Sequence, residues 1–413
     1  MSKRIIPYCT LLLVVLTSTV IAWAPFIIKG EFSTIYKHFD GPLYIISAKT
    51  GYNPEAFKRI DREPTLPHNS LYYAAHLPLY PFFIYLGSFA VGFLKSMIGV
   101  TLISSMALSC FFYYFLKRLN LTKHPFLLTS IFLLLPRFLV VRSVGSPEPL
   151  FLLLILSSLF FFEKKNYLFA GIFGGLATMT KTPGILLFPA YIFVLIESWS
   201  IGYLSFRSAL GGEKSRSVMT LRQVRLSFAR FLSRPEPAEG LLRNDKLVPN
   251  INWNWNWLFL LFIPLGLLAV FGIYYIQCND FFAYFHSGDN IHLVFPYAVF
   301  NSSSPWVGTA WLEDILFYFV LYISTVVILW KSKYRSFFYF ALIFLTATVF
   351  VQHRDISRYS LPLWPLACVA YEHIFTSKKA LLVGIVLIFG IYMYAWNFLG
   401  ANVMPISEWL PFM

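Results

Sequence analysis

Charged side chains are scarce in this chain, and acidic ones are scarcer than basic ones. Asp, Glu, Lys and Arg make up 13% of the 413 residues, whereas 58% are hydrophobic. A soluble domain carries about 25% charged residues because its surface faces water. Apolar runs such as 5–28, 257–276 and 380–398 are as long as a bilayer-crossing helix, which needs roughly 20 residues. The composition therefore excludes a soluble domain and indicates an integral membrane protein.

Regular alternation of apolar and polar residues is missing from these runs, which argues against a transmembrane β-barrel. Cysteine is sparse as well, and the four cysteines show neither CxxC pairs nor His/Cys ligand spacing. They are Cys9, Cys110, Cys278 and Cys368. Because three of them fall within predicted spans, we expect no disulfide framework and no cysteine-built metal site.

Basic residues outnumber acidic ones, giving a net charge of +14 and a pI near 9.5. Such a balance is typical of many nucleic-acid-binding proteins. Here the Lys and Arg residues gather in a few short loops between apolar runs, as the orientation signals of membrane proteins do. We therefore expect no nucleic-acid partner.

The apolar runs predict an all-α, polytopic transmembrane bundle of about 11–12 spans, with a large outer loop carrying short interfacial helices. With the N-terminus inside, the candidate spans are 5–28, 97–116, 125–141, 149–162, 167–180, 183–199, 257–276, 314–330, 336–351, 360–376 and 380–398. The stretch 78–94 is expected to be interfacial or re-entrant, because only then do the basic loops share one side. The first run exceeds the roughly 7–15 residues of a signal-peptide core, so we expect a retained anchor.

The basic loops predict the orientation. The expected cytoplasmic segments are 117–123, 164–165, 331–335, 378–379 and the basic stretch 200–250. The first outer loop, 29–77, and the second, 277–313, then face the other side. No inverted repeat of the kind found in many transporters is visible. Residues 1–413 are therefore expected to form a single integral membrane domain.

The first outer loop holds an acid close to the membrane, Asp40, followed by Gly41-Pro42-Leu43-Tyr44. An acid among aromatic residues and a turn-forming Gly-Pro is placed to act on something at the interface. The alternative is that Asp40 caps a short helix or turn. Farther along the same loop, His76 lies within the aromatic-rich stretch 72–81.

Two further candidates flank predicted spans. Glu148 stands between two prolines directly before an apolar run. A carboxylate at the lip of an apolar helix is costly and marks a functional site, or it complements the helix dipole. Arg137 and Arg142 lie close by and could pair with it. Lys181, flanked by two threonines, suits a phosphate, or it snorkels to water.

The fourth candidate is the outer stretch 353–359, which holds His353, Arg354, Arg358 and Tyr359. Two arginines and a histidine on one loop suit an anion, the alternative being charges that snorkel to water. Together the four candidates place two acids and several cations on the outer face at membrane depth. That arrangement suits a lipid-linked phosphate whose polar end reacts there.

These motifs resemble those of the GT-C glycosyltransferases, membrane enzymes that take sugars from polyprenyl phosphates, and above all the GPI-mannosyltransferase branch and its prokaryotic relatives. Five stretches carry the resemblance, in the family's order over most of the chain. They are Phe39-Asp40-Gly41-Pro42-Leu43-Tyr44, His76-Leu77-Pro78-Leu79-Tyr80-Pro81, Glu148-Pro149-Leu150-Phe151, Gly174-Gly175-Leu176-Ala177-Thr178-Met179-Thr180-Lys181 and Arg358-Tyr359-Ser360-Leu361-Pro362-Leu363-Trp364-Pro365.

The resemblance implies an inverting transfer of a hexose, mannose first of all, from a polyprenyl-phosphate donor to a hydroxyl of a lipid or glycan acceptor on the outer or lumenal face. Asp40 is then the catalytic base, and Glu148 orients the acceptor or Asp40. Lys181, Arg358 and Arg354 hold the phosphate. The expected substrate-binding set is completed by Tyr44, His76, Arg137 and Tyr359. Family members differ in their need for a divalent metal, Mg or Mn, so no cofactor is assigned.

Two other classes fit part of the pattern. A transporter or flippase of lipid-linked sugars would bind the same cargo without chemistry, but acids at the outer lip instead of the midplane favour an enzyme. A polysaccharide ligase or polymerase would be expected to carry paired arginines in a large late outer loop, and 277–313 contains none. The expected location is the plasma membrane of a prokaryote or the endoplasmic reticulum of a eukaryote, surrounded by membrane lipids.

Overall fold

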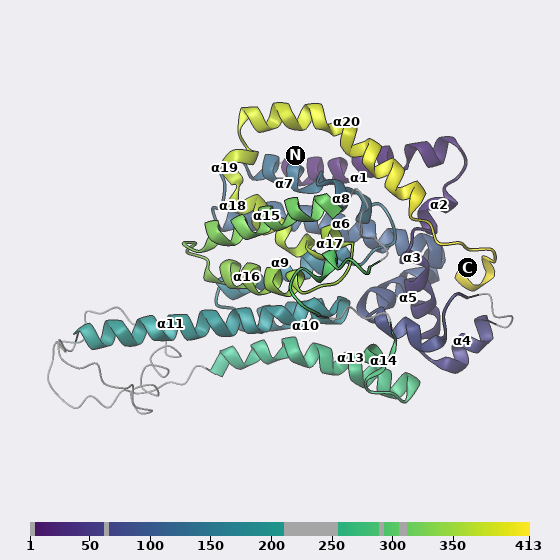
Figure 1. Cartoon of the computed structure of the whole chain (residues 1–413), viewed down its shortest axis with the longest axis horizontal. Helices are drawn as coiled ribbons and strands as arrows, with labels where there is room; N and C mark the ends of the chain where they lie inside the picture. The colour runs from purple at the N-terminus through teal and green to yellow at the C-terminus, as the bar shows by residue number, and fades with distance from the viewer. Residues whose placement is uncertain (1–4, 62–65, 210–254, 289–292, 305–311) are drawn as a thin grey trace.

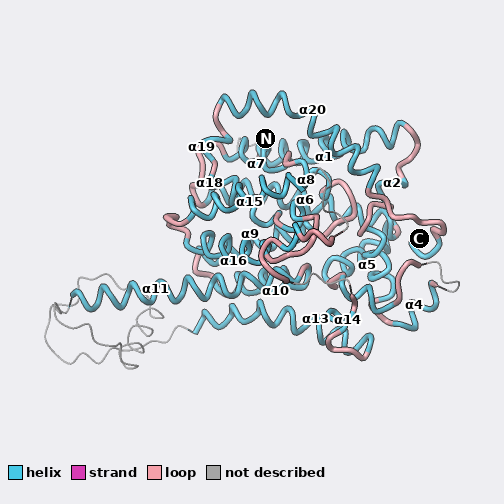
Figure 2. The backbone as a smooth tube through the Cα atoms, viewed as in Figure 1, coloured by secondary structure: helices cyan, strands magenta, loops and turns pink. Residues whose placement is uncertain are grey.

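The structure is a computed structural model that describes residues 5–61, 66–209, 255–288, 293–304 and 312–413. These residues form helices joined by loops (Figures 1 and 2), and their β-type pairing is limited to two isolated bridges, His38–Val403 and Leu293–Val351. The predicted all-α class is therefore confirmed.

The helices of the first half begin with a long span and continue through a series of short elements. They are α1 (Ile6–Ile28), α2 (Ser33–Tyr36), α3 (Gly41–Thr50), α4 (Pro54–Ile60), η1 (Ser70–Ala75), α5 (Leu79–Val91), α6 (Phe93–Arg118), α7 (Pro125–Leu133), α8 (Pro136–Val141), α9 (Glu148–Glu163), α10 (Tyr167–Thr180), η2 (Thr182–Leu186) and α11 (Leu187–Ala209).

The second half again mixes long and short helices. They are η4 (Trp255–Leu261), α13 (Phe262–Cys278), α14 (Ala283–His286), η5 (Ala298–Phe300), α15 (Leu312–Leu329), α16 (Arg335–Val349), α17 (Ile356–Tyr359), η6 (Leu361–Leu363), α18 (Trp364–Ala370), α19 (Glu372–Phe375), α20 (Lys378–Ala401) and η7 (Leu410–Phe412).

Five helical segments of the described chain are long and apolar enough to cross a bilayer: α1, α6, η4 with α13, α15 and α20. Shorter apolar helices, including α10 and α16, pack among them. The chain is therefore an integral, multi-pass membrane protein, as the sequence predicts. The total of about 11–12 spans stays a prediction.

A proline breaks one of the predicted spans, and a turn at Tyr371 breaks another. Span 125–141 divides into α7 and α8, because Pro136 lacks an amide hydrogen and holds Leu135 in an extended conformation with ψ of 127°. Span 360–376 divides into η6, α18 and α19, with Pro362 and Pro365 each lying in the first turn of one piece. The prediction of one continuous helix is wrong in both places.

Two further predicted segments, 78–94 and 200–250, take definite forms where the structure describes them. The stretch 78–94 contains α5, whose 13 residues end at Gly92, where a φ of +76° turns the chain into α6. A helix of this length is too short to cross a bilayer upright, and its interfacial placement stays a prediction. Helix α11 continues to Ala209, so the expected loop 200–250 begins as helix, and its residues from 210 on lie outside the described chain.

The long helices lie roughly parallel in Figure 1, with α20 beside α1 along one edge and α11 beside α13 along the other. The segment 29–77, predicted to be the first outer loop, folds into the short helices α2, α3, α4 and η1 at one end of the bundle. Helix α17 and the C-terminal end of α10 approach the same end. This end therefore gathers the loops in which the sequence places its candidate residues.

Candidate active site

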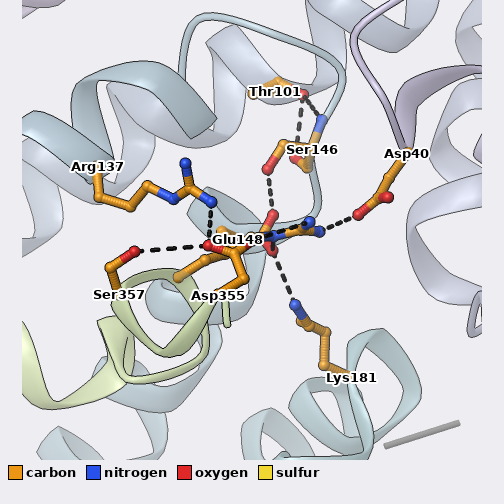
Figure 3. Close-up of polar contacts among 9 residues, drawn as sticks. Asp40, Thr101, Arg137, Ser146, Glu148, Lys181, Asp355 and Ser357 are labelled. Atoms are coloured by element: carbon orange, nitrogen blue, oxygen red, sulfur yellow. Dashed lines mark hydrogen bonds and ion pairs between the residues drawn. The ribbon is translucent and has the colours of Figure 1, made fainter. Parts of the chain in front are cut away.

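Arg358, on the one-turn helix α17, lies at the centre of the candidate site. Its guanidinium contacts the carboxylate of Asp40, and its Nε atom lies 2.5 Å from Oε1 of Glu148. Its Nη1 atom is 4.0 Å from Oδ2 of Asp355. Figure 3 shows Asp40, Glu148 and Asp355 converging from different segments. The planar, multi-donor guanidinium suits this task because it presents hydrogens in several fixed directions.

Asp40 occupies the N-cap position of α3, yet its side chain makes no capping hydrogen bond. It contacts Arg358 instead, so capping does not account for this acid. Burial raises the pKa of Asp40, but the Arg358 guanidinium outweighs burial and holds that pKa below its ordinary value. Asp40 is therefore an ionised carboxylate at neutral pH.

Glu148 opens α9 and is almost fully buried, with 3% of its side chain exposed. It accepts hydrogen bonds from Nζ of Lys181 at 2.8 Å, from Arg358 and from the hydroxyl of Ser146. Two cations and a hydroxyl fix this carboxylate as an anion, in addition to any favourable effect of the helix dipole. Glu148 therefore organises the cations, whereas Asp40 has a single close cation.

Lys181 follows the last residue of α10, where the chain leaves helical geometry before Pro183. Its Nζ atom contacts Glu148 and lies 5.6 Å from the ring centroid of Tyr359. Only 17% of its side chain is exposed. This lysine points into the site and does not snorkel to water.

The two arginines near Glu148 have other partners, so the expectation that either pairs with Glu148 is wrong. Arg137 pairs with Asp355 and lies 4.0 Å from the ring centroid of Phe398. Arg142 is fully buried and donates to Thr19 Oγ1 at 2.9 Å and to Ser18 of α1. The two arginines are five positions apart, which in helical geometry turns their side chains roughly 140° apart.

Tyr44 and His76 form a buried layer next to Asp40. The Tyr44 ring makes edge contacts with His76 at 4.8 Å and with Tyr80 at 5.0 Å between centroids. Burial lowers the pKa of His76 to about 4, so its imidazole is neutral. Its Nδ1 atom has no hydrogen-bond partner in the described chain. Arg354, in contrast, is exposed on the loop before α17.

A cavity of about 200 Å³ lies beside these ion pairs, and Glu148, Lys181, Arg358 and Tyr359 are part of its wall. The remaining wall is largely apolar. It includes Phe151, Leu152, Ile185, Leu186, Phe344 and Leu361. We call this space the apolar cavity. A cavity with cations on an otherwise apolar wall suits a ligand that has both a phosphate and a hydrocarbon part.

A second cavity, of about 10 Å³, includes His38, Asp40, Arg137 and Arg358 in its wall. We call it the small cavity. Arg358 lines both spaces, and its guanidinium joins Glu148, in the wall of the apolar cavity, to Asp40, in the wall of the small cavity. The site therefore has two compartments that share one cation.

Three further side chains belong to this site, although the sequence did not assign them a role: Asp355, Ser146 and His38. Asp355 contacts Arg137 and Arg358, and an acid three residues before an arginine in an outer loop was a usable signal. Ser146 donates to Glu148, and its backbone amide donates to Thr101 Oγ1 at 3.0 Å. In the described part of the chain, no group of three or more His, Cys, Asp or Glu side chains could hold a metal ion.

No protein-family model matches the sequence, and no curated protein matches it either. Among solved structures, the fold matches the crystal structure of the Archaeoglobus fulgidus oligosaccharyltransferase tethered with an acceptor peptide containing the NVT sequon. The TM-score is 0.51 and the sequence identity 12%, and the match covers 98% of this chain and 56% of that one. At this identity the likeness is one of fold. The chain thus shares a helical membrane fold with that oligosaccharyltransferase and spans a little over half of its length.

Proposed function

We propose that the protein is a GT-C glycosyltransferase that moves a hexose, mannose first of all, from a polyprenyl-phosphate donor to an acceptor hydroxyl on the outer face of the membrane. The observation that carries this proposal is that Arg358 lines both cavities and contacts an acidic side chain in the wall of each. These are Glu148 in the apolar cavity and Asp40 in the small cavity. The fold shared with an oligosaccharyltransferase supports glycosyl transfer. The likeness of the Asp40 and Arg358 motifs to the mannosyltransferase branch supports the choice of sugar.

The donor is placed in the apolar cavity. Its phosphate lies between Lys181 and Arg358, which supply charge-assisted hydrogen bonds to phosphate oxygens. The first isoprene units lie against the apolar wall, which includes Phe151 and Phe344. The donor would thus satisfy the polar and the apolar parts of this cavity together.

In the structure, both phosphate-binding cations already carry carboxylate partners. Lys181 contacts Glu148, and Arg358 contacts Asp40 and Glu148. A donor phosphate must therefore share or replace these carboxylates. When Arg358 turns part of its charge to the phosphate, Asp40 loses stabilisation of its ionised form, and its pKa rises. Donor binding would in this way turn Asp40 from an ion-pair partner into a usable base.

The reaction is a single displacement. The acceptor oxygen forms a bond to the anomeric carbon while the bond from that carbon to the phosphate oxygen breaks. The hydroxyl proton passes to the Asp40 carboxylate, and polyprenyl phosphate leaves with the electron pair, its charge held by Lys181 and Arg358. Attack from the face opposite the leaving group inverts the anomeric carbon.

Incubation of membranes that contain the protein with radiolabelled polyprenyl-phosphate sugars tests this proposal. We expect label to leave the carrier for one of the sugars, mannose first, and to appear in an acceptor. A transporter of lipid-linked sugars would leave the label on the carrier in every incubation. That result, for the whole panel of donors, would exclude the proposed transfer.

A further inference from the structure

The small cavity contains polar atoms that the described chain leaves without a partner. His38 Nε2 and Arg137 Nε are buried and have no hydrogen-bond partner among the described residues. Both side chains line the small cavity, and they are only 7% and 4% exposed. Leaving such a buried polar group without a partner is unfavourable, because it has lost its hydrogen bonds to water and gained none in return. Two of them in one wall point to a bound polar group.

His38 is held in place by pairing between distant parts of the chain. Its backbone forms an antiparallel bridge with Val403, just after α20. On either side, Phe39 N donates to Asn402 O at 3.2 Å and Met404 N donates to Lys37 O at 2.9 Å. The imidazole lies 6.0 Å from the ring of Phe398. This support fixes His38 against the site from two sides.

The size of the small cavity limits what it can receive. Its volume of about 10 Å³ is close to the lower limit for one water molecule, about 10–15 Å³. It therefore admits one hydroxyl group and excludes a sugar ring, a phosphate or an isoprene unit. Asp40, the proposed base, lines the same space.

We propose that the small cavity is the subsite for the nucleophilic hydroxyl of the acceptor, and that His38 Nε2 is the hydrogen-bond partner that positions this hydroxyl beside Asp40. This inference rests on the proposed function. The imidazole serves as a neutral partner, since burial lowers the pKa of His38 to about 4. At Nε2, a neutral imidazole either accepts a hydrogen bond from a hydroxyl or donates one to it, according to its tautomer. It does so without competing with Asp40 for the hydroxyl proton.

Methanol and a radiolabelled polyprenyl-phosphate hexose, the donor that the wild type uses, are the probes that test this subsite. Methanol carries a single hydroxyl on one carbon, and its product is a labelled methyl glycoside. His38→Phe keeps an aromatic ring beside Phe398 and removes the hydrogen bond, whereas His38→Gln keeps a polar atom near the Nε2 position. The exposed residue His124 supplies a control, His124→Phe.

For His38→Phe we expect kcat/KM for methanol to fall about 10- to 100-fold, which corresponds to one or two hydrogen bonds. The donor KM should change less than about twofold, and the melting midpoint in detergent should not fall, since a buried unsatisfied atom is removed. His38→Gln should recover most of the loss, and His124→Phe should match the wild type.

Two results would overturn the subsite while leaving the transferase intact. One is an unchanged kcat/KM for methanol in His38→Phe. The other is a joint loss of methanol use, donor binding and melting midpoint, because His38 would then be supporting the fold. A wild-type protein that never transfers label to any acceptor would instead reject the proposed function, and the subsite with it.

Discussion

At the scale of single residues, the site depends on ion pairs in which Arg358 joins Asp40 to Glu148 and Lys181 contacts Glu148. Asp40, Glu148, Lys181 and Arg358 stand in recognisable motifs, so each could be predicted as a candidate. Their pairing could not be predicted, because the partner that a long side chain reaches is set by the relative position and rotation of helices that are distant in sequence. Arg137 shows this limit, since it lies eleven residues before Glu148 yet contacts Asp355.

Lys181→Met should weaken donor use far more than acceptor use. Each charge-assisted contact is worth roughly 1.5–3 kcal/mol, so the apparent donor constant should rise about ten- to a hundredfold. The acceptor hydroxyl carries no charge for Lys181 to hold, so the apparent constant for the acceptor should change much less. Steady-state kinetics with each substrate varied in turn measures both.

Lys164→Met is the matched control, because Lys164 is an exposed lysine beyond the far end of α9. It should leave both constants unchanged. If donor and acceptor constants rise together in Lys181→Met, the lysine supports the fold, since Glu148 has lost one of its two close cations.

The pH dependence should differ between the free protein and the donor complex. Asp40 must be ionised to act as a base, so activity falls as the pH drops through its pKa. In the free protein Arg358 holds that pKa below its ordinary value, which is about 3.9 for Asp. In the donor complex the phosphate shares Arg358, so the pKa should be higher.

The acidic limb of kcat should therefore lie at higher pH than the acidic limb of kcat/KM for the donor, since these report the complex and the free protein respectively. Profiles from about pH 3 to pH 7 compare the two limbs. The donor is a phosphodiester and does not titrate in this range. Coincident limbs would show that the donor leaves the Asp40–Arg358 pair undisturbed.

At the scale of helices, hydropathy predicts where most spans lie but not where a helix is interrupted. Helices α1, α6, α15 and α20 match predicted runs within a few residues. Hydropathy alone does not divide 125–141 into α7 and α8, because a run of apolar residues looks continuous whether or not a proline breaks its hydrogen bonds. The resulting short helix α8 packs against α17, which carries Arg358.

Helix α10, which ends just before Lys181, is positioned by close backbone packing against α13. A Cβ atom added at Gly266 of α13 would lie 2.5 Å from the backbone oxygen of Gly175 in α10. Gly266→Ala should therefore force the two helices apart and destabilise the protein by about 1–3 kcal/mol. A lower melting midpoint in detergent would record this.

Gly272→Ala is the control on the same helix, because a Cβ atom there meets nothing within 4 Å. Alanine favours helix over glycine by about 1 kcal/mol, so this variant should be as stable as the wild type or more so. Equal destabilisation by both variants would mean that the close packing of α10 against α13 is not the cause of the stability loss in Gly266→Ala.

At the scale of the whole molecule, the site unites segments from the start, middle and end of the chain. Asp40 lies in the first outer loop, Glu148 and Lys181 near the middle, and Arg358 in the last part. Charge asymmetry predicts that all four face the same side of the membrane, and their contacts are consistent with it. Hydropathy alone could not show that these loops meet.

The orientation has a direct test in single-cysteine variants made in a background without the four native cysteines. We expect Ser70→Cys, in η1, to react with a membrane-impermeant maleimide in intact cells. Ser215→Cys should react only after permeabilisation, because the basic stretch 200–250 is predicted to be cytoplasmic. Equal labelling of both positions from outside would show that the topology is wrong.

The central claim is that Asp40 activates an acceptor hydroxyl against a donor held by Arg358 and Lys181. It is tested most directly by single-turnover transfer in proteoliposomes, with the wild type and Asp40→Asn compared on one labelled polyprenyl-phosphate hexose. Asp40→Asn keeps size and hydrogen bonding but lacks the basic oxygen, so transfer should slow about 100- to 10,000-fold while the protein inserts and still binds the donor. Transfer by Asp40→Asn at a rate near that of the wild type would contradict the account.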